Sequence, residues 1–107
     1  MSTAPKAAVH QLADLAQYQE GSIVSRQITK QEAGNVTLFA FDAGQELSEH
    51  TTPFDALVHV LDGEAEVFIS GEPFLVQAGQ IIILPAGKPH ALRAARRFKM
   101  LLTMIHA

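Results

Sequence analysis

The chain contains no cysteine, which excludes disulfide bonds, thiolate metal sites and thiol catalysis. It also lacks long apolar stretches. Uninterrupted apolar runs such as Ile81–Leu84 are far shorter than the ~20 residues that a membrane-spanning helix requires. No apolar run near the N-terminus is long enough for a signal peptide. We therefore expect a cytoplasmic protein that makes no contact with a membrane.

Charge is scarce as well. Charged residues make up 18% of the 107 residues and the formal net charge is −3, so no electrostatic case for binding DNA or RNA exists. Apolar residues make up 48%, which is too many for a disordered chain. A chain of this length forms one domain rather than two. Because so few charges are available for the surface, we expect some apolar residues to be covered by a second copy of the chain.

Two parts of the chain differ in the pattern of their apolar residues. Residues 1–20 form an N-terminal extension in which Leu12, Leu15 and Ala16 have helical spacing, which predicts a short helical turn. Residues 21–107 consist of short apolar runs separated by glycine and proline, a pattern typical of a closed or sandwiched antiparallel sheet. The sequence therefore predicts a single all-β domain after residue 20.

Several strands and turns follow from local pattern. Ser22–Thr29 and Val36–Phe41 are rich in β-branched and aromatic residues and predict two strands with a turn at Gly34-Asn35. The dipeptide Asp62-Gly63, with a strand-like run on each side, predicts a two-residue hairpin.

The segment Ala91–Met104 permits two interpretations. Its content of Ala, Leu, Arg, Lys and Met favours a helix. Its apolar residues also alternate, with Met100, Leu102 and Met104 on one side, which favours strands. Local pattern alone leaves both open.

Histidine is the only residue type here suited to chemistry near neutral pH. The five histidines are His10, His50, His59, His90 and His106. Two of them, His50 and His90, follow a glycine at a fixed interval and lie at the edge of a strand-like segment. These two are the candidates for a functional site.

The sequence around His90 resembles the second conserved motif of the cupin superfamily. Gly79, Pro85, Gly87 and His90 have the spacing of that motif, and only its final asparagine differs, being Ala94 here.

The first cupin motif is matched in part. Gly44, His50 and Gly63 are in place, whereas the second histidine is replaced by Thr52 and the glutamate by Ala56.

The resemblance implies an antiparallel jelly-roll β-barrel of the RmlC-like type, often dimeric, with strands directly after His90. It further implies a pocket inside the barrel formed by four residues, namely His50, Thr52, Ala56 and His90. Cupins hold a metal there with imidazoles and a carboxylate, a ligand set that suits Fe, Mn, Ni, Cu or Zn. Apolar residues on both faces of Leu38–Phe41 also favour a homodimer.

Only two of the four implied metal ligands are present, His50 and His90. Two imidazoles without a carboxylate compensate a divalent charge poorly, and catalytic metal sites generally use three protein ligands. An additional ligand could come from Glu46, which shares strand parity with His50, or from His59 or His106. His59 has the opposite parity to position 56, so we expect it to face away from the pocket.

Two functions remain open at this point. One is a non-catalytic module that binds a small molecule at His50 and His90. The other is a metal-dependent cupin enzyme, an oxygenase, isomerase or decarboxylase, that acts on a small organic acid or a sugar-like compound. The missing ligands at Thr52 and Ala56 favour the first, and retention of the two histidines favours the second.

Overall fold

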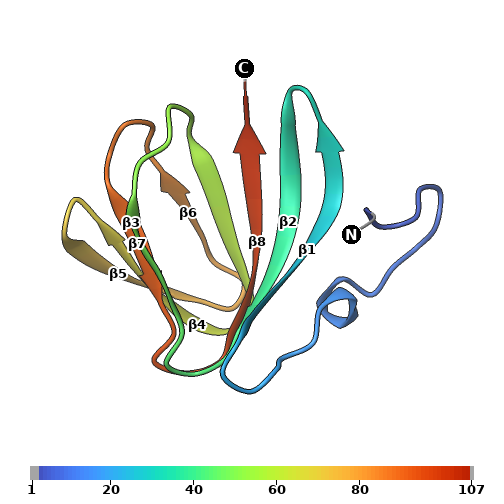
Figure 1. The fold of residues 1–107 in the computed structure, drawn as a ribbon, viewed down its shortest axis with the longest axis horizontal. Helices are drawn as coiled ribbons and strands as arrows, with labels where there is room; N and C mark the ends of the chain where they lie inside the picture. The colour runs from blue at the N-terminus through green and yellow to red at the C-terminus, as the bar shows by residue number, and fades with distance from the viewer. Residues whose placement is uncertain (1–2, 107) are drawn as a thin grey trace.

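A computed structural model describes residues 3–106 as a curled, antiparallel β-structure (Figure 1). The described elements are η1 (Leu12–Leu15), β1 (Ile23–Gln31), β2 (Gly34–Phe41), β3 (Glu46–His50), β4 (Ala56–Ile69), β5 (Glu72–Gln77), β6 (Ile81–Leu84), β7 (His90–Arg93) and β8 (Phe98–Ile105). The only helical element among residues 3–106 is the 3₁₀ turn η1. The expected all-β jelly-roll architecture is confirmed.

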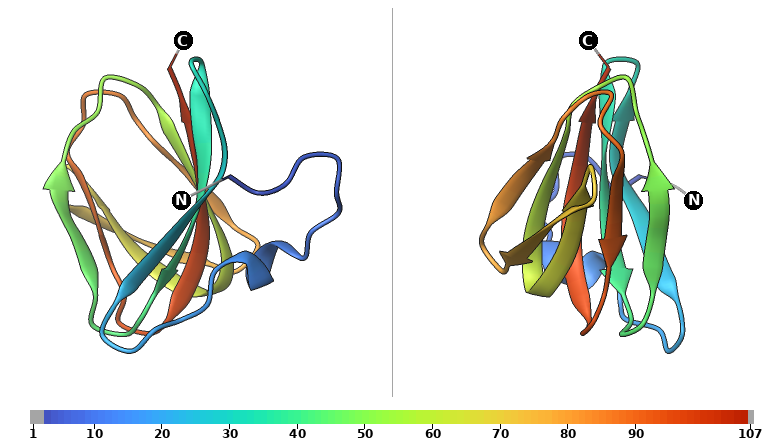
Figure 2. Two further views of the ribbon diagram at one scale, coloured as in Figure 1. Left: turned by 45° about the vertical axis from the view of Figure 1, so that its right-hand side comes forward. Right: turned by 90° about the vertical axis from the view of Figure 1, so that its left-hand side faces the viewer.

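The strands form two layers that share β4. The large sheet consists of β1, β2, β8, the first half of β4 and β6, and the small sheet consists of β3, β7, the second half of β4 and β5. The two layers curve toward each other (Figure 2). Buried apolar side chains from both layers form one core, which includes Phe41, Val58, Val67, Phe98 and Met100. Burial of these side chains is the main force that holds the layers together.

The predicted hairpin at Asp62-Gly63 is wrong. Strand β4 continues through both residues and carries the chain from the large sheet to the small one. The pairing with β8 shifts between Val60 and Asp62, and Gly63 has φ of 71°. A side chain at Gly63 would collide with the backbone oxygen of Arg97. The dipeptide therefore marks a bend within a strand, because glycine permits the positive φ that the bend requires.

The predicted turn at Gly34-Asn35 is displaced by two residues. Gly34 begins β2 and pairs with Gln31, so the turn consists of Glu32 and Ala33. Glycine is needed at position 34 because a side chain there would collide with the carbonyl of Met104 on the adjacent strand.

The segment Ala91–Met104 forms strands β7 and β8, as the resemblance implied. Strand β8 lies between β2 and β4 and pairs with both of them. Pairing along both edges therefore overrides the helical propensity of its residues.

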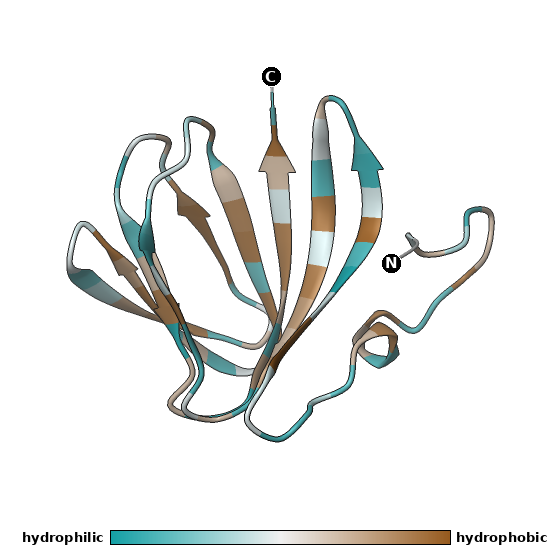
Figure 3. Ribbon diagram, viewed as in Figure 1, coloured by the Kyte–Doolittle hydropathy of each residue, from teal (hydrophilic) through white to brown (hydrophobic). Residues whose placement is uncertain are grey.

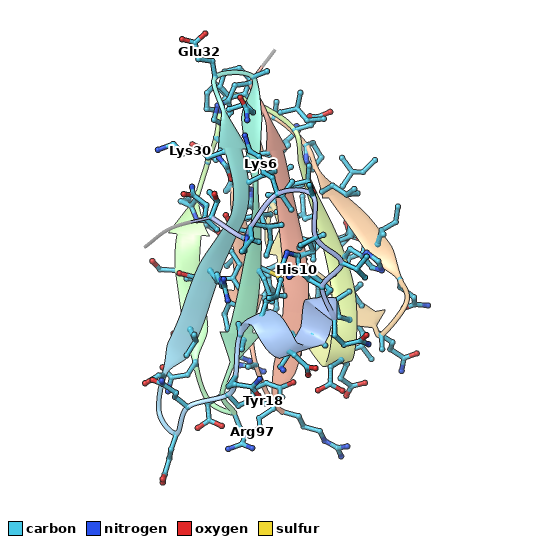
Figure 4. All side chains as sticks on the ribbon, turned by 90° about the vertical axis from the view of Figure 1, so that its right-hand side faces the viewer. Lys6, His10, Tyr18, Lys30, Glu32 and Arg97 are labelled. Carbon is cyan, nitrogen blue, oxygen red and sulfur yellow. The ribbon has the colours of Figure 1, made fainter. Side chains whose placement is uncertain are left out.

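The N-terminal segment crosses the outer face of the large sheet, with η1 lying over its central strands (Figure 4). Leu12, Leu15 and Tyr18 pack against a second cluster of buried residues that includes Leu38 and Ala40. Polar contacts also hold this segment in place. The Tyr18 hydroxyl donates to Asp62 at 2.6 Å, and Lys99 Nζ donates to the carbonyl of Ala13 at 2.6 Å.

The part of that outer face along β4, β6 and β8 is largely apolar and exposed. Apolar residues continue along β4, β6 and β8 (Figure 3). Ile81, Ile83 and Ile105 have exposed fractions of 59%, 56% and 58%. No helix among the described residues has the length and apolar character needed to cross a membrane.

Candidate functional site

A cavity of about 80 Å³ lies between the two sheets, near the end of the barrel formed by loops 51–55 and 85–89. We call this end the mouth; it is the end nearest the C-terminus in Figure 1. The small sheet and the loop after β3 line one side of the cavity with Leu47, His50, Thr52, His90 and Leu92. The large sheet lines the other side with Ala56, Leu84, Met100, Leu102 and Met104. All four residues of the pocket expected from the sequence therefore line one cavity.

His50 and His90 face each other across two paired strands. His50 ends β3, His90 begins β7, and the two residues are direct partners in the ladder. Their Nε2 atoms are 3.2 Å apart, and their rings have a centroid separation of 4.4 Å at 72°. Two imidazoles that are forty positions apart in the sequence thus converge on one point at the mouth.

Each of these imidazoles also faces a backbone carbonyl with its other nitrogen. His50 Nδ1 lies 3.0 Å from the oxygen of Ser48, and His90 Nδ1 lies 3.3 Å from the oxygen of Lys88. A carbonyl oxygen only accepts, so a neutral ring that donates to it carries its hydrogen on Nδ1 and has a lone pair on Nε2. The two Nε2 atoms lie at hydrogen-bond distance, 3.2 Å, so the pair either shares one hydrogen or presents two lone pairs to one external cation or donor. The pair is arranged to receive such a group.

The environment of His90 keeps its ring neutral. The side chain is buried, with 3% of the residue exposed, and burial lowers the pKa of His90 below its ordinary value. Repulsion from a charged His50 lowers that pKa further, and the contact with the carbonyl of Lys88 opposes the shift. The Nε2 lone pair of His90 is therefore available at neutral pH.

Glu46 does not line the cavity. The pairing of β3 with β7 shifts register between Leu47 and His50, which breaks the expected parity between Glu46 and His50. As a result Leu47 lies on the cavity wall and Glu46 is exposed.

His59 and His106 also lie away from the cavity. In the ladders His59 lies opposite Ile81 and Leu101, positions on the outer face of the large sheet. The ring of His106 packs against Phe54, with a centroid separation of 5.1 Å. Neither histidine is within the cavity wall.

The residues at the site do not fit the metal centre that the resemblance implies. That centre needs a second imidazole and a carboxylate where this chain has Thr52 and Ala56. Nothing in residues 3–106 groups three or more His, Cys, Asp or Glu side chains in a way that could hold a metal ion. The imidazoles of His50 and His90 are the nitrogen donors that line the cavity.

Sequence reasoning missed two cavity residues with donor atoms. Met100 and Met104 line the same cavity as the two histidines. Their alternation with Leu102 indicated that the three residues share one face, but it did not indicate that this face borders a cavity. The missing information is the position of β8 opposite the histidines.

Comparison with known proteins agrees with this fold. Residues 37–106 match the family model described as Cupin domain. No curated protein sequence matches the chain.

Solved structures extend the similarity. A conserved protein of unknown function from Streptococcus pyogenes is 36% identical, with a TM-score of 0.91 over 100% of this chain and 96% of that one. A cupin superfamily protein from Desulfitobacterium hafniense is 26% identical, with a TM-score of 0.91 over 99% and 97% of the two chains.

A third similar structure is longer than this chain. The cupin 2 conserved barrel domain protein from Leptotrichia buccalis is 41% identical, with a TM-score of 0.87 over 90% of this chain. This chain spans 47% of that protein. The extent of the family match and the identities above establish that the chain belongs to the cupin family.

Proposed function

We propose that the protein binds a small, largely apolar molecule in the barrel and holds its one polar group between His50 and His90. The observation that carries this proposal is the 3.2 Å separation of two Nε2 atoms whose rings are both fixed by backbone carbonyls. Such a pair accepts one hydrogen-bond donor or one cation and holds it at the mouth.

The rest of the cavity wall limits the class of guest. Apart from the two histidines, its side chains are apolar except for Thr52, whose hydroxyl already donates to the oxygen of Phe54 at 2.8 Å. A polyol would leave most of its hydroxyls without partners among these side chains, which is costly wherever water is excluded. A cavity of about 80 Å³ is also smaller than the ~150 Å³ that accommodates benzene.

Titration with three five- to six-atom probes tests this proposal. Pyrazole carries one N–H donor, furan is a ring of the same size without a donor, and glycerol is a polyol. We expect pyrazole to bind and to shift the side-chain NMR resonances of His50 and His90, and furan to bind at least tenfold more weakly. His50→Ala and His90→Ala should abolish the difference between pyrazole and furan. Preferential binding of glycerol, or pyrazole binding that neither substitution alters, would contradict the proposal.

A metal-dependent enzyme is the second candidate. The convergence of His50 and His90 favours it, because a divalent Fe, Mn, Ni, Cu or Zn ion would be a cation of the kind that the pair accepts. Elemental analysis of tag-free protein purified without chelator tests it. Stoichiometric divalent metal that is lost in His90→Ala supports the enzyme, and protein that binds pyrazole without any metal supports the binding module.

We also assign the bare outer face of the large sheet to a homodimer. Ile81, Ile83 and Ile105 lie together there, each more than half exposed, whereas the N-terminal segment covers the adjoining part of the same face. A group of exposed large apolar side chains is typical of a subunit contact.

Sedimentation of two matched variants tests the dimer. Ile83 and Leu75 are equally exposed, at 56% each, but Leu75 lies on β5 of the small sheet. Ile83→Arg should convert the dimer to a monomer, and Leu75→Arg should leave it intact. A wild-type monomer, or dissociation by Leu75→Arg alone, would exclude this interface.

A further inference from the structure

We infer that the metal ion suited to this cavity is copper(I), held by His50, His90 and the thioether of Met104. The inference rests on the proposed function, since it takes the space between the two imidazoles as the site where a cation is held. It replaces the divalent ion of the family's usual metal centre with a soft monovalent one. Three observations support it: the charge of the donor set, the position of Met104 and the separation of the imidazole nitrogens.

The donors around the cavity are neutral. The wall contains no carboxylate, and imidazole nitrogens and thioether sulfurs carry no charge. A divalent ion at this site would lack a compensating negative charge among its ligands, which is unfavourable. Thioether ligands select Cu(I), and imidazole is also a good ligand for copper. A monovalent soft ion therefore matches this donor set better than a hard divalent one.

Met104 occupies the position that completes the set. It is the direct partner of Ala56 in the ladder between β8 and β4, and Ala56 is the position where cupins carry the carboxylate. Side chains of direct partners start about 4.5–5.5 Å apart at Cβ, so a long side chain at 104 reaches the space beside residue 56. Alanine leaves that space empty, and both residues line the cavity.

The separation of the two imidazoles calls for a third ligand. With metal–nitrogen bonds of about 2.0–2.1 Å, a linear pair of imidazoles would place its nitrogens about 4 Å apart. The Nε2 atoms of His50 and His90 are 3.2 Å apart, so an ion bound to both is held in a bent arrangement with one side open. Met104 on the large sheet lines the same cavity as the two imidazoles, so its thioether is available as the third ligand.

Met100 provides a matched control within the same strand. It also lines the cavity, but it pairs with Val60, four residues along β8 from Met104. Four residues of strand correspond to about 13 Å, which places Met100 toward the other end of the barrel. The two methionines therefore share chemistry and strand but differ in their distance from the histidine pair.

Anaerobic titration of the tag-free full chain with Cu(I), in competition with bicinchoninate, tests the inference. We expect Met104→Leu to weaken Cu(I) binding at least tenfold and Met100→Leu to change it less than twofold. His50→Ala and His90→Ala should abolish binding. X-ray absorption should detect a sulfur ligand in the wild type and Met100→Leu and none in Met104→Leu. The chain has three methionines and no cysteine, so the sulfur signal has few sources.

Thermal unfolding of each variant provides a check on folding, because a leucine in place of Met104 preserves size and apolar character. Unchanged Cu(I) affinity and sulfur signal in Met104→Leu would overturn the inference. Binding of Zn²⁺ more tightly than Cu(I) would overturn it as well. If the wild-type protein binds pyrazole but not Cu(I), this inference alone is overturned. If it binds neither pyrazole nor Cu(I), the proposed function is overturned as well.

Discussion

The two ends of the barrel each contain a pair of aromatic rings. The two pairs have the same centroid separation but differ in residue type, ring angle and exposure. At the end opposite the mouth, which we call the closed end, Phe41 and Phe98 stack with a centroid separation of 4.4 Å at 15°. At the mouth His50 and His90 are also 4.4 Å apart, but at 72°. Both phenylalanines are fully buried, whereas His50 is exposed. At the closed end the two rings pack in the core, whereas at the mouth the two rings bring their Nε2 atoms together.

The contrast extends to the residues around each pair. At the closed end Phe41 and Phe98 are fully buried, and burial of such large apolar side chains contributes to stability. The mouth carries the small residue Ala56 and the polar residue Thr52, and these leave a cavity. We therefore expect substitutions at the closed end to affect stability most and substitutions at the mouth to affect the proposed binding most.

Matched phenylalanine truncations should produce the largest effect. Phe98→Ala removes a fully buried ring and should lower the free energy of unfolding by about 3–5 kcal/mol. Phe54→Ala removes a partly exposed ring at the mouth that packs on His106, and should cost about 1 kcal/mol. Urea denaturation measures both. Equal losses would show that the two ends do not differ in stability.

Restoring a carboxylate at the mouth should change metal preference. Ala56→Glu should raise the affinity for Zn²⁺ by about tenfold or more, because it adds an anionic ligand beside two imidazoles. Without metal the same substitution should lower the free energy of unfolding, since Ala56 is only 3% exposed.

Ala56→Gln is the control for Ala56→Glu, because it has nearly the same shape without the charge. Calorimetric titration with Zn²⁺ should give weaker binding to the glutamine variant. Equal affinities would mean that position 56 does not reach the ion.

The smallest effect should be a pH dependence that belongs to the mouth. The pKa of His90 is lowered in the fold from 6.5, chiefly by burial. Above pH 6.5 the ring is neutral in both states. As the pH falls below 6.5 the unfolded chain takes up a proton that the fold resists, so the free energy of unfolding decreases.

His90→Gln should reduce this dependence, and His10→Gln on the N-terminal segment should leave it unchanged. Asp42 affects the free energy of unfolding in a different pH range. The side chain of Arg97 and the amide of Gly21 hold the pKa of Asp42 below 3.8, so its contribution is lost only in stronger acid. Urea denaturation between pH 4 and 8 measures the profile. An identical slope in wild type and His90→Gln would contradict the assignment.

The fold could be predicted from the sequence because the spacing of the glycines, prolines and histidines resembles the cupin motifs. The interval from Gly79 to His90 indicated the strands and loop around the second histidine, and through the resemblance it resolved Ala91–Met104 as strands. Asp62-Gly63 misled because a glycine that permits a bend inside a strand has the same local signature as one that closes a hairpin.

The site was predictable only in part. The positions of His50 and His90 followed from the motifs, but the place of Glu46 depended on a register shift in β3 that nothing in the sequence marks. Met104 was missed for a related reason. Its place on the cavity wall beside Ala56 depends on the pairing of β8 with β4, a contact between segments that are far apart in the sequence.

The central position of β8 has a consequence for how the chain reaches this structure. Strands β2 and β4 are both synthesised well before β8, and each leaves one edge unpaired until β8 inserts between them. Folding dominated by such distant pairings is slow, and open strand edges invite aggregation meanwhile. Chaperone demand and expression yield should therefore respond most strongly to substitutions that delay the insertion of β8.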